Sequence, residues 1–320
     1  MSYVDRMHDL LLHVAGRVPD EFMATARRQL AAGMVGDVAL AVCLQLVQRK
    51  VPVTIEQAGL LSELVDDSAT ALFSGIRITE HDFSSPWRFV WNPERPNSDI
   101  DDATAALVAV LDVTPAARGL WLSWRMSWSG GPLYPVYVVE ADGGDHARLS
   151  AELHVAVADR LDVPRIEVVG LSEAPSYQRA ARNSGELVWS VAEPSELFIA
   201  NVFNRVDRLG GPSLDDHPRL TEPADREHVL AHLRAGQVLV STDTTMIDVV
   251  QPGRGSVVPI GFRTDGVWLW PEAIAYYLEE YGLAPDERFL AHIRTAERPL
   301  GPVSTVIVDR ALRQLLDPSS

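Results

Sequence analysis

The segment from Ser256 to Tyr281 limits the possible folds of this chain more than any other part of it. It reads SVVPIGFRTDGVWLWPEAIAYYLEEY. Two stretches of alternating residues flank Asp265-Gly266, a dipeptide that favours a hairpin because a type I′ turn needs positive φ at both central positions. Pro271 falls where the first turn of a helix tolerates a missing N–H group. The segment therefore predicts a tight β-hairpin whose second strand leads directly into a helix.

Charged and aromatic side chains crowd this hairpin, which makes it the first place to expect a binding site. They are Arg263, Asp265, Trp268, Trp270 and Glu272, joined by Arg254 in the preceding Pro252–Gly255 loop. Trp268 and Trp270 are two residues apart on a strand, so both point to the same face. The pair is either a stacking platform for a ligand or partner, or two core aromatics under the following helix. Arg263 and Asp265 either supply charge at the rim of that platform or pair with each other across the turn.

A second group of polar residues lies on a helix expected from Ala224 to Arg234. Asp225, His228 and His232 are spaced i, i+3 and i+7, so they share a face. Two imidazoles and a carboxylate are a zinc-binding combination. Apolar residues occupy the opposite side of the helix, however, which predicts that the histidines form a solvated stripe. We therefore expect no metal and no cofactor, with these three residues as a weak metal candidate.

Charge and composition exclude several classes of protein. The 320 residues carry a formal net charge of −16, which disfavours nucleic-acid binding because no basic stripe offsets it. The longest apolar stretch, Val38 to Val47, falls far short of the roughly 18 residues of a membrane span. The N-terminus has no apolar segment typical of a secretory signal. We expect a cytoplasmic protein that binds neither membranes nor nucleic acid.

The sequence contains none of the common catalytic signatures. Lys50 is the only lysine, so no phosphate-binding P-loop can form. A Gly-x-Ser-x-Gly elbow, a Cys-x-x-Cys pair and a dinucleotide-binding fingerprint are also missing. Asp243 and Asp248 are a conceivable catalytic pair, but their spacing along the chain does not fix their separation in space. These observations favour a non-catalytic protein.

Apolar periodicity predicts an α+β fold that begins with helices. Residues 1–75 read as a helical domain, 76–102 as an ordered connecting segment, and 103–192 and 193–320 as two small α+β domains with mainly antiparallel sheets. The element order in the middle domain predicts helices on one face of its sheet. In the last domain, the apolar spacing predicts a helix from Pro194 to Val206, ahead of the hairpin–helix module.

The C-terminal module also resembles known proteins. Phe262 to Leu278 form the pattern FRTDGxWxWPEAxAYYL, which Gly282 to Asp286 and Leu290 to Ile293 extend. The pattern resembles a module of uncharacterised actinobacterial proteins, some of which are similar to polymorphic-toxin immunity proteins or to type VII secretion-associated proteins. The middle section, Pro135 to Trp189, is similar in element order to the C-terminal domain of the SseB-like family. Neither resemblance implies a catalytic residue.

Two functions from different classes fit these features. The first is a non-catalytic protein that binds another protein, as an immunity or accessory factor in a toxin or secretion system. An acidic surface suits a basic toxin or secreted effector, and Trp and Arg are frequent at interface hot spots. The alternative is a small-molecule-binding sensor or an enzyme with a pocket at the C-terminal hairpin. We expect the first, because the sequence places no nucleophile or general base beside the hairpin.

Overall fold

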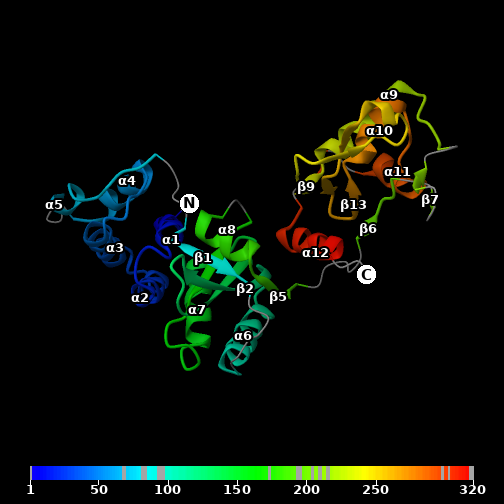
Figure 1. The fold of residues 1–320 in the computed structure, drawn as a ribbon. Coiled ribbons are helices and arrows are strands. Elements are labelled where there is room, and N and C mark those ends of the chain that lie inside the picture. Colours follow the sequence, from blue (N-terminus) through cyan, green and yellow to red (C-terminus); the bar gives the residue numbers. More distant parts are fainter. Residues whose placement is uncertain are drawn as a thin grey trace. The chain divides into compact units, whose positions relative to one another are not determined.

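A computed structural model describes most of the chain. The described residues are 2–66, 70–80, 85–91, 98–171, 174–191, 197–202, 205–207, 211–213, 217–296, 299–301 and 303–316. The fold is α+β, as the sequence predicts, and the chain divides into two compact units, residues 1–192 and 193–320 (Figure 1). The finer division at residues 75 and 102 stays a prediction. No helix of the described part combines the length and the apolar character that crossing a membrane requires.

The N-terminal unit begins with consecutive helices. They are α1 (Tyr3–Val14), α2 (Asp20–Ala31), α3 (Val35–Arg49), α4 (Ile55–Leu64) and α5 (Thr70–Phe73). The capping box that Thr54 and Gln57 predict is present at the start of α4, with both reciprocal hydrogen bonds formed. A similar box, formed by Ser2 and Asp5, begins α1. Capping residues in the local sequence therefore determine where α1 and α4 start.

A five-stranded sheet follows these helices. Its strands are β1 (Trp87–Val90), β2 (Ala117–Ser127), β3 (Tyr134–Ala141), β4 (Ile166–Val169) and β5 (Glu186–Ser190). The order is β1-β2-β3-β4, and β5 also pairs with β2. The β3–β4 pair is parallel and the remaining pairs are antiparallel. Part of the expected connecting segment, residues 76–102, thus contributes strand β1 to the sheet.

Helices cover both faces of this sheet, whereas the sequence predicts one covered face. Helices α6 (Ser98–Leu111) and α7 (His146–Ala156) pack on the face that carries Leu120 and Leu122. Helix α8 (Ser176–Asn183) contacts β1, β2 and β3 on the other face, where Trp121 and Arg125 are buried (Figure 1). The prediction failed because β2 buries the residues of both alternating sets, which is typical of a fully covered strand.

The C-terminal unit is built around a four-stranded sheet in the order β6-β13-β12-β9. Its strands are β6 (Phe198–Ile199), β9 (Gln237–Val240), β12 (Phe262–Thr264) and β13 (Trp268–Pro271). Two smaller hairpins pair β7 (Arg205–Asp207) with β8 (Gly211–Ser213), and β10 (Thr245–Ile247) with β11 (Ser256–Pro259). The helices are α9 (Pro223–Ala235), α10 (Ala273–Tyr281), α11 (Glu287–Thr295) and α12 (Thr305–Leu316).

The helix expected from Pro194 to Val206 is not formed by the described residues of that range. Phe198 and Ile199 instead form β6, which pairs in parallel with Trp268 and Leu269 of β13. Residues 192–196, 203 and 204 lie outside the described part. Apolar spacing alone cannot separate a helix from a short strand, and here the pairing with β13 decides the outcome.

Candidate functional site

The predicted hairpin is present, but its turn differs from the expected type. Strands β12 and β13 pair from Phe262 opposite Pro271 to Thr264 opposite Leu269. Within the turn only Gly266 has a positive φ, of 93°, so the turn is not type I′. The Asp265 side chain closes the turn instead, because its Oδ1 accepts hydrogen bonds from the backbone N–H groups of Val267 at 3.0 Å and Trp268 at 2.8 Å.

Both tryptophans of the hairpin are core residues. Trp270 is fully buried and Trp268 is 6% exposed, so the burial matches the core interpretation of this pair. Their rings pack on Phe289 of α11, with centroid distances of 5.1 Å and 4.9 Å. The indole N–H of Trp270 donates to the carbonyl of Leu233 at the end of α9. A Cβ at Gly236 would lie 2.3 Å from the Trp270 ring, so a glycine is required where α9 meets this ring.

Arg263 forms an ion pair with Glu272 and not with Asp265. Its Nε lies 2.7 Å from Oε1 of Glu272. Arg263 also donates to the carbonyls of Arg234 and Gly236, each at 3.0 Å. These two carbonyls lie at the C-terminal end of α9, where a cation satisfies orphan acceptors. Arg263 therefore fastens the hairpin to α9, and the structure does not bring it together with Asp265.

Arg254 belongs to a different cluster, around the buried carboxylate of Asp248. Its guanidinium lies 2.7 Å from Glu280 and 4.0 Å from Asp248. Asp248 accepts hydrogen bonds from the hydroxyls of Tyr276 and Tyr281 and from two backbone N–H groups. Burial alone would raise the pKa of Asp248, but these hydrogen bonds outweigh burial and hold its pKa below the usual value. The cluster fixes the β10–β11 hairpin against α10.

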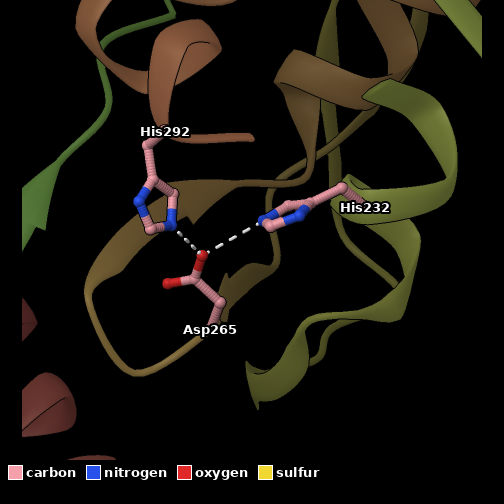
Figure 2. A group of neighbouring side chains, drawn as sticks. All are labelled: His232, Asp265 and His292. Atoms are coloured by element: carbon pink, nitrogen blue, oxygen red, sulfur yellow. Dashed lines mark hydrogen bonds and ion pairs between the residues drawn. The ribbon is translucent and has the colours of Figure 1, made fainter. Parts of the chain in front are cut away.

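The centre of the candidate site is a cluster of His232, Asp265 and His292 (Figure 2). His232 comes from α9, Asp265 from the hairpin turn and His292 from α11. Both imidazoles point at one carboxylate oxygen: Nε2 of His232 lies 3.1 Å and Nε2 of His292 lies 2.7 Å from Oδ2 of Asp265. The turn that the sequence identifies thus sits between two helices that each contribute a histidine.

Hydrogen bonding keeps Asp265 ionised. Its burial would raise the carboxyl pKa, but the imidazole of His232, two backbone N–H groups and the imidazole of His292 donate to it. Their combined effect holds the pKa of Asp265 well below its usual value. Because an ionised carboxylate only accepts hydrogen bonds, both Nε2 atoms carry the proton in this arrangement. Nδ1 of His232 is buried, and it has no hydrogen-bond partner among the described residues.

The set that the structure assembles shares one residue with the set expected from the sequence. His232 belongs to both, but Asp225 forms an ion pair of 2.5 Å with Arg294, and His228 is half-buried outside the cluster. The expectation that the histidines line a solvated stripe is wrong for His232, which is 1% exposed. Among the described residues, the group with metal-binding spacing is His232, Asp265 and His292.

Sequence reasoning missed His292 as a member of the site. It lies 27 residues beyond Asp265 and 60 beyond His232 in the chain, so no local motif joins them. One usable signal was present: His292 follows Phe289 by three residues on a predicted helix, which places both on one face. Since Phe289 packs on the hairpin tryptophans, that face also brings His292 to the turn.

The N-terminal unit contains a separate polar hollow of about 770 Å³. Five arginines and three carboxylates line it, in a chain whose net charge is −16. Two of these arginines, Arg125 and Arg165, share the single carboxylate of Asp20. Arg125 lies over the ring of Trp87 with 4.1 Å between the guanidinium carbon and the ring centroid. The hollow is therefore locally positive on an acidic protein.

Comparisons with protein-family models, with curated proteins and with solved structures gave no match to this chain. The interpretation of both regions accordingly rests on the arrangement of their own side chains.

Proposed function

We propose that this chain is a non-catalytic protein that binds a basic partner protein through its C-terminal unit. The observation that carries the proposal is the edge strand β9. Natural proteins protect edge strands with charged side chains, proline or bulges, because an unprotected edge pairs with other strands. Gln237–Val240 contains neither proline nor charge, and its pairing with β12 is irregular at one point, between Phe262 and Arg263. Val238 and Val240 are 39% and 38% exposed although α12 also contacts this strand.

The partner that suits this edge is an extended segment rich in Lys and Arg. Strand addition supplies affinity through the main chain, and side-chain contacts supply the choice of partner. A net charge of −16 attracts a basic chain and speeds its encounter. The biological setting that accords with the C-terminal resemblance is a cytoplasmic immunity or accessory factor of a toxin or secretion system, with a basic toxin or secreted effector as the partner.

The test compares two variants with the same change in charge. Val238→Lys with Val240→Lys places the charges that protect natural edges on β9. The control, Val113→Lys with Val155→Lys, changes two exposed valines of the N-terminal unit, 79% and 67% exposed. A partner recovered in stoichiometric amount by the unaltered chain is titrated against all three proteins. We expect at least a tenfold weaker affinity for the β9 variant alone.

Two results would remove this proposal. One is equal affinity of the β9 and control variants for the recovered partner. The other is a partner that binds equally well at low and high salt, since attraction between an acidic surface and a basic chain is screened by ions.

A second candidate function is the binding of an anionic small molecule in the N-terminal hollow. Its size lies within the range of ligand sites, and its lining has five arginines against three carboxylates. Arg17→Gln with Arg49→Gln lowers this positive charge, and Arg118→Gln with Arg148→Gln is the control outside the hollow. With pyrophosphate as the probe, we expect at least tenfold weaker binding for the first variant and no change for the second. No binding of pyrophosphate to the unaltered chain would exclude this candidate.

A further inference from the structure

Three potential ligand atoms converge at the hairpin turn from three separate elements. They are Nε2 of His232, Oδ2 of Asp265 and Nε2 of His292, and all lie within 4.8 Å of one another. Ligand atoms about 2.0–2.1 Å from a tetrahedral zinc ion are roughly 3.3 Å apart. The observed distances from Oδ2, 3.1 Å and 2.7 Å, need to open by about 0.2 Å and about 0.6 Å to reach that value.

The chemistry of these donors selects a class of metal ion. Two imidazole nitrogens and one carboxylate oxygen suit zinc and its neighbours among the divalent transition metals, whereas calcium and magnesium prefer sets made of oxygen alone. Three protein ligands with a fourth position left for water or another molecule are typical of an open zinc site. The set also differs from a structural zinc site, because the chain has a single cysteine, Cys43, and it is buried in the N-terminal unit.

The surrounding structure holds each donor in place. Asp265 cannot swing away without losing its hydrogen bonds to the backbone N–H groups of Val267 and Trp268. The ring of His232 packs against both Trp270 and Phe289, with centroid distances of 5.7 Å and 6.3 Å. The carboxylate uses Oδ1 for the turn and leaves Oδ2 for the two histidines. The donors are therefore preorganised by groups that a metal would leave undisturbed.

One side of the cluster is open to solvent. The side chains of His232 and Asp265 are 0% and 3% exposed, whereas that of His292 is 25% exposed. An ion reaches the cluster from the His292 side, and its fourth position faces the same way. Burial of the other two ligands strengthens the attraction between a cation and the Asp265 carboxylate, because water screens it less.

The simpler interpretation is that the two imidazoles only donate hydrogen bonds to the carboxylate and hold the elements together. In that case both protons stay on Nε2. In a metal site they move to Nδ1, which usually donates to a fixed partner. Nδ1 of His232 has no such partner among the described residues, so the hydrogen bond from Nε2 to Asp265 alone sets the tautomer of this ring. An ion bound at Oδ2 replaces that hydrogen bond, and Nε2 can then present its lone pair to the ion.

We propose that His232, Asp265 and His292 bind one divalent transition-metal ion of the zinc class through Nε2, Oδ2 and Nε2, with the fourth position open on the His292 side. The protein-binding proposal places recognition on β9, so this inference is independent of it. It also assigns the metal to a different set from the one that the spacing on α9 indicates.

The test is a titration of the full chain with Co²⁺, followed by competition with Zn²⁺, after removal of metals with a chelator. Co²⁺ bound by two nitrogens and an oxygen at an open site gives visible absorption that Zn²⁺ abolishes. We expect one ion per chain for the unaltered protein. His292→Ala removes the most exposed ligand and should weaken Co²⁺ binding at least tenfold, and Asp265→Asn should do the same while its amide oxygen still accepts the turn hydrogen bonds.

The matched control is His228→Ala, which removes the neighbouring histidine of α9 that the sequence suggested. We expect it to bind Co²⁺ with unchanged affinity. Far-ultraviolet circular dichroism checks that all variants are folded, and His292→Gln replaces His292→Ala if the latter is not. The proposal is overturned if the unaltered chain binds no stoichiometric Co²⁺, if loss of His292 leaves the affinity unchanged, or if His228→Ala weakens binding as much as His292→Ala.

Discussion

The two units neutralise their buried carboxylates in different ways. In the N-terminal unit, guanidinium groups face the carboxylates directly, in the pairs Arg27–Glu167, Arg125–Asp20 and Arg182–Glu140. In the C-terminal unit, Asp248 and Asp265 are surrounded mainly by hydroxyl, imidazole and backbone donors. In a buried ion pair each charge compensates the other, so neither is left to attract a ligand. Hydroxyl and backbone donors carry no charge that cancels the charge of the carboxylate, and a cation can replace some of the donors around it.

Both kinds of contact join separate elements of the fold, but they use different side chains. Arg27 of α2 reaches both Glu167 and the carbonyl of Ile166 on β4, so the ion pair joins the N-terminal helices to the sheet. Asp265 also joins elements, α9 and α11, but through two imidazoles, one of them partly exposed. The N-terminal ion pairs therefore connect elements of the fold, whereas the C-terminal cluster keeps donor atoms that a cation could use.

Acid should produce the largest difference between the two units, by destabilising the N-terminal unit more than the C-terminal unit. Burial lowers the pKa of His8 to about 4 and that of His154 to about 3. Both stay neutral in the folded N-terminal unit, whereas the unfolded chain binds protons below a pH of about 6.5. Their contribution to stability is complete above that pH and is lost as the pH falls, by up to about 2.7 kcal/mol per pH unit for the two together.

Urea unfolding between pH 7 and pH 5, followed by peptide-resolved hydrogen exchange, measures this loss. The N-terminal unit should lose stability more steeply, because Asp248 and Asp265 have lowered pKa values and stay ionised over this range. His154→Gln should roughly halve the dependence of the unfolding free energy on pH, because His8 alone then contributes. Equal losses of stability in the two units would contradict this prediction.

Removing one half of a buried ion pair should have the next largest effect. Arg27 and Glu167 have side chains 2% and 4% exposed and lie 2.6 Å apart. Among the described residues, Arg27→Met leaves the amide of Gln178 as the side-chain donor to the Glu167 charge. The expected cost is about 3–5 kcal/mol in the free energy of unfolding. Chemical denaturation of the full chain measures it.

Two further variants control for this effect. Arg27→Met with Glu167→Gln should recover part of the lost stability, because no uncompensated charge remains. Arg148→Met removes an exposed pair with Glu152 and should leave the denaturation midpoint unchanged. Equal losses for Arg27→Met and Arg148→Met would contradict the assigned role of the buried pair.

Loss of one neutral donor in the C-terminal unit should cost much less. Tyr276→Phe removes a hydroxyl that lies 2.9 Å from Oδ2 of Asp248, while the hydroxyl of Tyr281 and two backbone N–H groups remain. We expect a loss of about 1–2 kcal/mol in the free energy of unfolding. Tyr3→Phe, at a residue 50% exposed, is the control for removing a hydroxyl. A loss for Tyr276→Phe as large as that for Arg27→Met would show that the two modes of neutralisation do not differ.

The parts of the fold that sequence predicts well are those decided within a few residues. The hairpin, the helix after it and the capping box of Thr54 and Gln57 follow from local patterns, and all are present. The turn type was missed because the side chain of Asp265, rather than a positive φ, closes the loop. The segment after Pro194 was missed because a strand partner about 70 residues away decides its structure.

The site itself was only half predictable. The hairpin drew attention to Asp265, but its two partners are on helices that local spacing does not connect to the turn. His232 was noticed for its spacing to His228, and packing instead turned it inward against Trp270. Ion pairs such as Arg27–Glu167, which join residues 140 positions apart, leave no trace in a single sequence.

Hydrogen exchange of the full chain with and without one equivalent of Zn²⁺ tests the central claim most directly. Binding to the folded state alone stabilises the elements that supply the ligands. The account predicts slower exchange in α9, in the β12–β13 hairpin and in α11, with residues 1–192 unchanged and with the protection lost in His292→Ala. Protection that is absent, that spreads over both units, or that persists in His292→Ala would contradict it.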